Sequence, residues 1–406
     1  MWPQVAGVLY DGCDTGGMPA APPPVPAVDR LPAGLATLAD HEAHARTRLD
    51  DNAWAYFSGG AGDEITLRAN RAAWDALQLH PRVLRPLQGG NTRVELLGRQ
   101  LAHPILVAPV AFQRMAHADG ELATAHAASA LGAGLVLSTQ ASTPLEAIAA
   151  AIAHEPGRGP LWFQLYLQHD RGFTRALVQR AEQAGYEALV LTVDAPTSGA
   201  RDRERRAGFQ VPPHAAAVHL AALSRPPPVM LAPGQSALFD ALLQHAPTWD
   251  DVQWLQSISR LPVLLKGVTH AEDARQAAAL QVAGLIVSNH GGRTLDTVPP
   301  TAVLLPPIVD AVGSTLPVLV DGGIRRGTDI LKAMALGARA VLVGRPVVWG
   351  LANAGAVGVA HVLRLLRDEL EIAMALCGCA SLADCSPQML WRAAPWAPQI
   401  PTPHPP

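Results

Sequence analysis

From about residue 104 onward, short runs rich in Val, Ile and Leu recur about every 25 to 30 residues, with one longer gap. The eight runs are Pro104–Val110, Gly134–Ser138, Leu161–Tyr166, Ala188–Val193, Pro262–Lys266, Gly284–Ser288, Pro317–Asp321 and Ala340–Gly344. Ala-rich segments with helical spacing lie between them, among them Asp119–Leu131, Gly172–Ala184, Ala271–Leu280 and Thr328–Leu336. Near-continuous apolar strands that alternate with helices predict an α/β protein with a parallel sheet covered on both faces. Because there are eight units, we expect a closed (β/α)8 TIM barrel rather than an open sheet.

Two segments interrupt this repeat. Residues 40–103 precede the first run, and we expect them to form helices that close the bottom of the barrel. Residues 202–248 follow the fourth run and are rich in proline. A long loop after the C-terminal end of a barrel strand, where active sites lie, is interpreted as an active-site lid.

The two ends of the chain differ in composition from the barrel. Residues 1–34 are rich in Pro, Ala and Gly. Such a segment buries too little apolar surface to order itself, so we predict a flexible tail, within which Met18 is a second candidate start residue. The Pro-rich residues 391–406 are interpreted as a C-terminal tail, which leaves residues 35–390 as the barrel domain.

Composition argues against several classes of function. The chain has 31 Lys and Arg against 34 Asp and Glu, a formal charge of −3, so it lacks the positive field that nucleic-acid binders use. Four cysteines are too few for a disulfide scaffold, and the spacing of Cys377, Cys379 and Cys385 is not that of a zinc site. We therefore expect no metal and ordinary thiols in a cytoplasmic protein. No signal-peptide pattern is recognised, and the apolar stretch Pro346–Leu363 is interpreted as a buried barrel helix rather than a membrane span.

Glycines and arginines follow the last two runs. Residues 321–325 read Asp-Gly-Gly-Ile-Arg, ahead of a helix expected to begin near Thr328, and Gly344-Arg345 follows the eighth run. Glycine lets the backbone approach a ligand closely, and arginine supplies a bidentate fork for an anion. Loops after strands seven and eight are the recurrent phosphate site of this fold, so we predict a bound phosphate rather than plain turn glycines.

The sixth run leads into Ser-Asn-His-Gly-Gly-Arg at residues 288–293. His290 precedes Arg293 by three residues, which offers a base beside an anion clamp on a strand-end loop. Asp194, at the end of the fourth run, is placed to orient this imidazole and to stabilise its protonated form. Arg201 is placed to supply a second guanidinium for the anion that Arg293 would clamp. Residues 202–206 are interpreted as a solvated face.

Lys266 ends the fifth run, and two interpretations of it stay open. Buried lysines in barrels form Schiff bases, which would make the protein an aldolase-type lyase. Alternatively, Lys266 is a fixed cation placed near negative charge that develops on a cofactor ring.

The motifs, in this order and spacing, resemble the FMN-dependent 2-hydroxy acid oxidases and dehydrogenases, a family that includes glycolate oxidase and lactate oxidase. The resemblance runs from about Asn52 to about Ala383. It is densest in the segments 108–111, 163–166, 191–194, 265–268, 288–293 and 321–327, of which 288–293 is the most specific. It implies bound FMN, oxidation of a small L-2-hydroxy acid (lactate, glycolate or mandelate-like) to the 2-oxo acid, and a homotetramer.

The resemblance also implies a role for each matching position. His290 would be the active-site base, paired with Asp194, and Lys266 would stabilise the reduced flavin. The residues implied to hold the substrate, together with His290, are Arg201, Arg293, Tyr56 and Tyr166. The residues implied to contact FMN are Pro109, Val110, Ala111, Ser138, Gln164, Thr192, Lys266, Ser288, Asp321, Gly322, Gly323, Arg325, Gly344 and Arg345.

Two positions depart from the family pattern, so substrate size is not implied. Gln140 stands where glycolate oxidase has a bulky aromatic residue, and Val110 replaces a hydroxyl residue beside the flavin. With no haem domain or convincing membrane segment recognised, oxygen is the favoured electron acceptor. A quinone or cytochrome acceptor, a lactate 2-monooxygenase, the Schiff-base lyase and a non-catalytic FMN-binding relative stay as alternatives.

Overall fold

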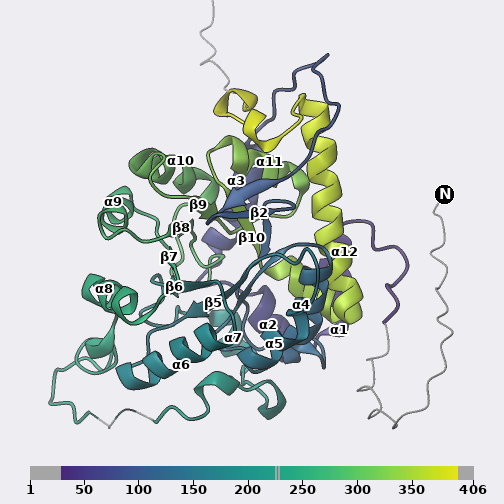
Figure 1. The fold of residues 1–406 in the computed structure, drawn as a ribbon. Coiled ribbons are helices and arrows are strands. Elements are labelled where there is room, and N and C mark those ends of the chain that lie inside the picture. Colours follow the sequence, from purple (N-terminus) through teal and green to yellow (C-terminus); the bar gives the residue numbers. More distant parts are fainter. Residues whose placement is uncertain (1–28, 225, 227–228, 392–406) are drawn as a thin grey trace, which may run out of the picture.

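The computed structural model describes residues 29–224, 226 and 229–391. Within these residues, eight parallel strands form a closed barrel in the order β10-β3-β4-β5-β6-β7-β8-β9 (Figure 1). The strands are β3 (Ile105–Val107), β4 (Gly134–Leu137), β5 (Leu161–Leu165), β6 (Ala188–Thr192), β7 (Val263–Lys266), β8 (Gly284–Val287), β9 (Val318–Val320) and β10 (Ala340–Val343). Each predicted apolar run contains one of these strands, so the predicted (β/α)8 barrel is confirmed.

Helices surround the barrel and bury the outer face of its strands. They are α4 (Gly120–Ala130), α5 (Leu145–Ile152), α6 (Arg171–Gln183), α8 (Trp249–Ile258), α9 (Ala271–Ala279), α10 (Thr301–Val312), α11 (Gly327–Ala335) and α12 (Arg345–Cys377). In β3, Leu106 joins the apolar cluster inside the barrel, while Ile105 and Val107 join the cluster beneath the helices. Because both faces are buried, the strands are apolar at nearly every position.

Residues 40–103 form helices, as predicted, but the prediction that these helices close the bottom of the barrel is wrong. The antiparallel hairpin β1 (Val94–Leu96) and β2 (Arg99–Leu101) closes that end, with Val94, Leu96 and Leu101 packed against the barrel interior. Its apolar side chains alternate with polar ones, the pattern of a strand with one buried face.

The helices of this segment lie beside the opposite end of the barrel. They are α1 (Leu38–Arg48), α2 (Asp51–Ser58) and α3 (Ile65–Ala76). The indole of Trp74 in α3 donates to the carbonyl of Gly322, and Arg293 donates to the carbonyl of Gly59 just after α2. Gly322 and Arg293 both lie in loops that follow barrel strands. Helices α2 and α3 therefore border the C-terminal ends of these strands.

The long segment after β6 borders a cavity at this same end. It begins with the short helix α7 (Asp202–Arg206) and continues through 3-10 turns to α8. Leu220, Val229 and Leu242 line the cavity, as expected for an active-site lid.

Helix α12 packs against α1, α4 and α11 on the outside of the barrel. It has the length and composition of a membrane-crossing helix, but 78% of its apolar window is buried inside the molecule. This agrees with the interpretation of residues 346–363 as a buried barrel helix. The tails predicted at residues 1–34 and 391–406 lie mainly outside the described residues.

Candidate active site

A cavity of about 1340 Å³ lies at the C-terminal ends of the barrel strands. The predicted site residues that line it are Tyr56, Pro109, Val110, Ala111, Ser138, Gln164, Tyr166, Thr192, Arg201, Lys266, His290, Arg293, Asp321, Gly322, Gly323, Arg325, Gly344 and Arg345. The two predicted residues that do not line it, Asp194 and Ser288, contact side chains that do. One cavity thus brings together Tyr56 of α2 and residues at the C-terminal ends of the barrel strands, from Pro109 to Arg345.

His290 is held from two sides in the loop after β8. Its Nδ1 lies 2.9 Å from Oδ1 of Asp194, and its backbone N–H donates to Oγ of Ser288 over 3.0 Å. With the Nδ1 proton directed to Asp194, Nε2 is the basic atom and lies 3.5 Å from the hydroxyl of Tyr166. The backbone of His290 has φ +56°, a left-handed conformation uncommon outside glycine and enriched at functional sites.

The buried carboxylate of Asp194 is kept ionised by its neighbours. Burial alone would raise the pKa of Asp194, but His290 and Lys266 hold that pKa below its ordinary value. An ionised carboxylate at this place stabilises an imidazolium, so the pair fits a general base that gains a proton during reaction.

Lys266 is also buried, and its ammonium forms an ion pair. Its Nζ lies 3.0 Å from Oδ2 of Asp321 and donates to Oγ of Ser288 over 2.8 Å. Burial acts to lower the pKa of Lys266, but Asp321 and Asp194 raise it above the ordinary value. A protonated lysine is a fixed cation and a poor Schiff-base nucleophile, which favours the second interpretation of Lys266. Ser288, which is also predicted to contact FMN, does not line the cavity, and its hydroxyl accepts from the Lys266 ammonium.

Three polar side chains continue along the barrel mouth. Oγ of Ser138 donates to Oε1 of Gln164 over 3.3 Å, and Nε2 of Gln164 donates to Oγ1 of Thr192 over 3.0 Å. All three are buried and line the cavity. They form a fixed polar row at the ends of β4, β5 and β6, next to β3, which leads into the apolar wall of Pro109, Val110 and Ala111. This arrangement fits a flat ring with polar edges.

Arg293 and Arg201 converge on one acidic side chain. Arg293 donates to Oε1 of Glu204 over 3.0 Å, and NH1 of Arg201 lies 3.4 Å from the same oxygen. Arg293 also donates to the carbonyls of Tyr56 and Gly59, and its guanidinium lies 4.7 Å from the centre of the Tyr56 ring. Two guanidiniums against one carboxylate leave a positive charge, which suits a carboxylate ligand.

The interpretation of residues 202–206 as a solvated face is wrong for two of them. Glu204 lines the cavity, and Arg203 forms an ion pair with Glu64 and donates to Oγ of Ser58. The alternation of acidic and basic residues does not predict these contacts, because they depend on how α7 packs against α2. Arg205 remains largely exposed, as expected.

Arg325 and Arg345 supply partly buried positive charge at the predicted phosphate end. The guanidinium of Arg325 lies 4.6 Å from the centre of the Trp349 ring, and Arg345 donates to the carbonyls of Phe57, Gly59 and Gly291. Within the described residues neither forms an ion pair.

Burial lowers the pKa of both guanidiniums. The pKa of Arg325 falls to about 10, and that of Arg345 falls to about 9, where the charges of Arg293 and Arg325 add to the effect of burial. A phosphate dianion would provide the missing countercharge. The residues of this cavity therefore fit FMN, with the ring against the polar row and the phosphate near these arginines.

Comparison with known proteins agrees with this geometry. The family model described as FMN-dependent dehydrogenase matches residues 45–392. The chain belongs to the FMN-dependent dehydrogenase family, and its cofactor is FMN.

Several relatives align over nearly their whole length. The chain is 50% identical over 356 residues to an L-lactate oxidase of Alicycliphilus denitrificans, which covers 88% of this chain and 96% of that protein. It is 45% identical over 351 residues to glycolate oxidase 1 of Zea mays, covering 86% and 94%. A crystal structure of mandelate oxidase with (S)-2-phenylpropionate superimposes with a TM-score of 0.77 at 44% identity, covering 87% of this chain and 97% of the other.

Proposed function

We propose that this protein oxidises a small L-2-hydroxy acid to the 2-oxo acid, with oxygen as the electron acceptor. The observation that carries the proposal is the placement of a base and a carboxylate clamp in the cavity that fits FMN. His290 is the base, held by Asp194, and Arg293 and Arg201 are the clamp.

The arginines and tyrosines position the substrate in this scheme. Its carboxylate binds Arg293 and Arg201, and the hydroxyl of Tyr166 adds a donor 3.5 Å from Nε2 of His290. Burial raises the pKa of both Tyr166 and Tyr56 above the ordinary value, so each phenol stays protonated and can donate. Fixing the carboxylate at one end sets the α-carbon and its hydroxyl beside the imidazole.

His290 then takes a proton from the substrate at Nε2. The resulting imidazolium is stabilised by the ionised carboxylate of Asp194 across the 2.9 Å contact. FMN, when bound, supplies the electron acceptor of the reaction. The ammonium of Lys266 lies in the same cavity and stabilises negative charge that develops there.

L-Lactate is the substrate we favour. Relatives about half identical to this chain are named L-lactate oxidases, whereas those named glycolate oxidases are 43–45% identical. The cavity lining also includes Leu220 and Leu242, whose apolar side chains suit a methyl group. The relatives are named oxidases, which supports oxygen over a quinone or a cytochrome.

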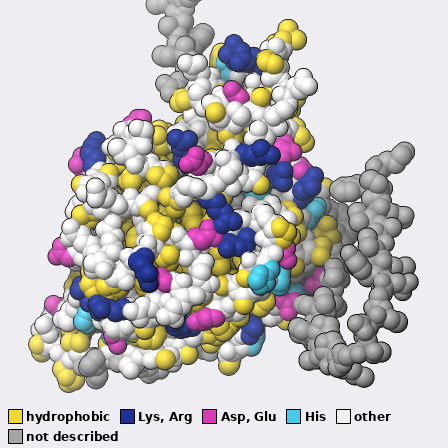
Figure 2. All heavy atoms as spheres, viewed as in Figure 1, with side chains coloured by type: hydrophobic (Ala, Val, Ile, Leu, Met, Phe, Trp, Pro, Cys, Tyr) yellow, Lys and Arg dark blue, Asp and Glu magenta, His cyan; other side chains and the backbone are white. Residues whose placement is uncertain are grey.

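A homotetramer in the cytoplasm completes the proposal. The segment with the exposed Val83 and Leu84 runs beside the end of α12, where the N–H of Arg82 donates to the carbonyl of Cys377. Ile372 and Leu376 of α12 are exposed as well. Exposed apolar area of this kind suits contact with another copy of the chain. On the face in Figure 2, basic and acidic side chains are interspersed, which agrees with a partner other than nucleic acid.

A substrate panel tests the function. Oxygen uptake and hydrogen peroxide are measured with L-lactate, D-lactate, glycolate and (S)-mandelate. We expect L-lactate to give the highest kcat/KM, D-lactate to give none, and peroxide to equal the pyruvate formed. Acetate in place of pyruvate would show a monooxygenase, and turnover only with a quinone or cytochrome would show a dehydrogenase.

A further inference from the structure

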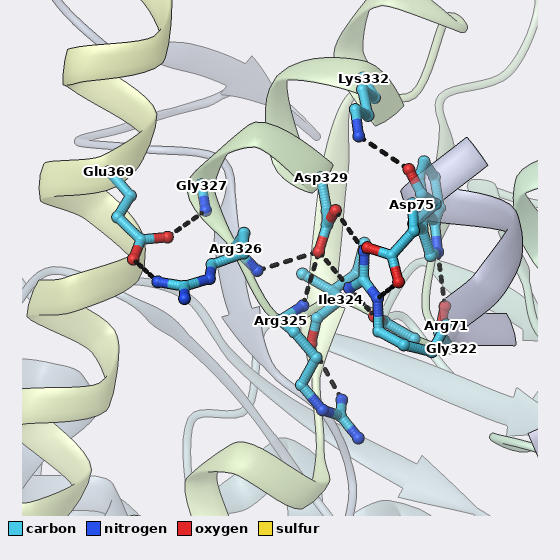
Figure 3. A network of polar contacts seen from close by, with 12 residues as sticks. Arg71, Asp75, Gly322, Ile324, Arg325, Arg326, Gly327, Asp329, Lys332 and Glu369 are labelled. Atoms are coloured by element: carbon cyan, nitrogen blue, oxygen red, sulfur yellow. Dashed lines mark hydrogen bonds and ion pairs between the residues drawn. The ribbon is translucent and has the colours of Figure 1, made fainter. Parts of the chain in front are cut away.

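The carbonyl groups of the phosphate loop, residues 322–326, are held by α3. The carbonyl of Gly322 accepts from Nε1 of Trp74 over 2.8 Å, and that of Gly323 accepts from NH1 of Arg71 over 2.7 Å (Figure 3). Because these peptide bonds are trans, the N–H groups of Gly323 and Ile324 point away from α3. Within the described residues no protein acceptor is recorded for these two N–H groups, and both residues line the cavity.

Arg71 is held in place by a buried carboxylate. It donates to Oδ1 of Asp329 over 2.8 Å, and Asp329 is almost fully buried. Oδ2 of Asp329 accepts the backbone N–H groups of Arg325 and Arg326, each over 2.9 Å. Arg71 therefore contacts the loop directly and also through Asp329 (Figure 3).

Helix α3 lies so close to the loop that only glycine fits at residue 323. A Cβ atom on Gly323 would lie 2.5 Å from the carbonyl oxygen of Asn70 and 2.9 Å from Cδ1 of Trp74. The φ of +87° at Gly323 independently favours glycine. The contact between α3 and the loop is therefore tight packing along the backbone.

We propose that Arg71 and Trp74 are positioning residues for the FMN phosphate. By holding the two carbonyls, they leave the N–H groups of Gly323 and Ile324 directed at the phosphate beside Arg325. This inference rests on the proposed placement of the phosphate at this loop. It goes beyond that placement because Arg71 and Trp74 of α3 do not line the cavity, yet are inferred to strengthen the binding of FMN.

The test compares FMN with riboflavin, which lacks the phosphate. Holoenzyme is equilibrated by exchange with mixtures of the two flavins, and the bound flavins are released and quantified. The variants are Arg71→Lys, which keeps the charge but loses the fork, and Trp74→Phe, which removes the indole donor and keeps a buried aromatic ring. Arg68→Lys is the matched control, because Arg68 is an exposed arginine of the same helix whose guanidinium donates to the carbonyl of Asp63, away from the loop.

The expected result is a selective loss of preference for FMN. Wild type and Arg68→Lys should retain FMN strongly, Arg71→Lys should lower the FMN-to-riboflavin preference by about tenfold, and Trp74→Phe should lower it severalfold. A residue that only supports folding would weaken both flavins alike and leave the ratio unchanged.

Two results would overturn the inference, and they are distinguishable. If wild type prefers FMN and Trp74→Phe keeps the full preference, α3 does not position the phosphate, even if Arg71→Lys fails to fold. If wild type itself shows no preference for FMN over riboflavin, the placement of the phosphate is wrong and the inference fails with it.

Discussion

The imidazole of His290 and the carboxylate of Asp194 meet across 2.9 Å although they lie 96 residues apart in the sequence. They follow β8 and β6, two strands separated in the barrel only by β7. The contact leaves one imidazole nitrogen for the substrate and assigns the other to the carboxylate. It also gives Asp194 a measurable role in the rate of proton transfer.

Replacing this carboxylate should slow flavin reduction without loss of FMN. Asp194→Asn keeps the shape but removes the charge that stabilises the imidazolium, so we expect the anaerobic reduction rate with L-lactate to fall by about 100-fold or more. Stopped-flow absorbance at the flavin band measures this rate. Asp202→Asn, on the outside of α7, is the control and should match wild type. A rate for Asp194→Asn within a factor of two of wild type would contradict the assigned role.

Substitution of the carboxylate clamp should act on substrate binding. Arg293 uses both terminal nitrogens at once, toward Glu204 and toward the carbonyls of Tyr56 and Gly59. Lysine cannot reproduce this fork, so Arg293→Lys should raise KM by about 100-fold. Arg205→Lys, a change at an exposed arginine of α7, should leave KM unaltered. If Arg293→Lys had the KM and kcat of wild type, Arg293 would not bind the substrate carboxylate.

The ion pair of Lys266 predicts the outcome of Schiff-base trapping. Because Asp321 and Asp194 raise the pKa of Lys266 despite its burial, the amine is protonated at neutral pH. Incubation with pyruvate and borohydride should therefore give no mass increase on the Lys266 peptide. A stable adduct there would support the lyase instead.

Lys266→Met tests the cation directly, and we expect flavin reduction to slow by about 100-fold.

Two histidines should make the fold sensitive to acid. Burial lowers the pKa of His41 and of His103 to about 4 in the folded chain, against 6.5 as the ordinary value. The unfolded chain thus binds protons below pH 6.5 that the folded chain does not bind until about pH 4. Stability is therefore lost as pH falls through this window, by up to about 1.4 kcal/mol per pH unit for each histidine.

Thermal unfolding between pH 7 and pH 4 checks this expectation. Nε2 of His103 donates to the carbonyl of Leu131, and Nδ1 of His103 accepts from the N–H of Ile105. In His103→Gln the titrating group is absent, so its Tm should fall less steeply with acidification than that of wild type. His126→Gln, at an exposed position of α4, should keep the wild-type slope. Equal slopes in all three proteins would contradict the assignment.

The barrel and most of its cavity could be predicted from the sequence because both depend on local patterns. Eight apolar runs determine the strand count, and residues that follow a strand must lie at the barrel mouth. His290, Asp194 and Arg293 could be placed by this rule without knowing any distance. The resemblance to a known family then assigned roles that the rule alone does not provide.

The residues missed are those whose role depends on contacts between distant segments. Arg71 and Trp74 lie on an ordinary amphipathic helix, and nothing in its pattern shows that it faces Gly322 and Gly323. Glu204 alternates with basic residues like a solvated charge, and only the turn of α7 directs it to Arg293. The hairpin at the bottom was missed because its three-residue strands mix apolar and polar residues, whereas the equally short β3 and β9 are apolar at every position.

The most direct test of the central claim is an anaerobic absorbance titration of the holoenzyme with L-lactate, followed by admission of air. The account predicts that L-lactate bleaches the flavin band of wild type and that air restores it. It also predicts that His290→Ala, which still binds FMN, is not bleached. Absence of bleaching by L-lactate, glycolate and (S)-mandelate would contradict the proposed reaction, and rapid bleaching of His290→Ala would contradict the assignment of His290 as the base.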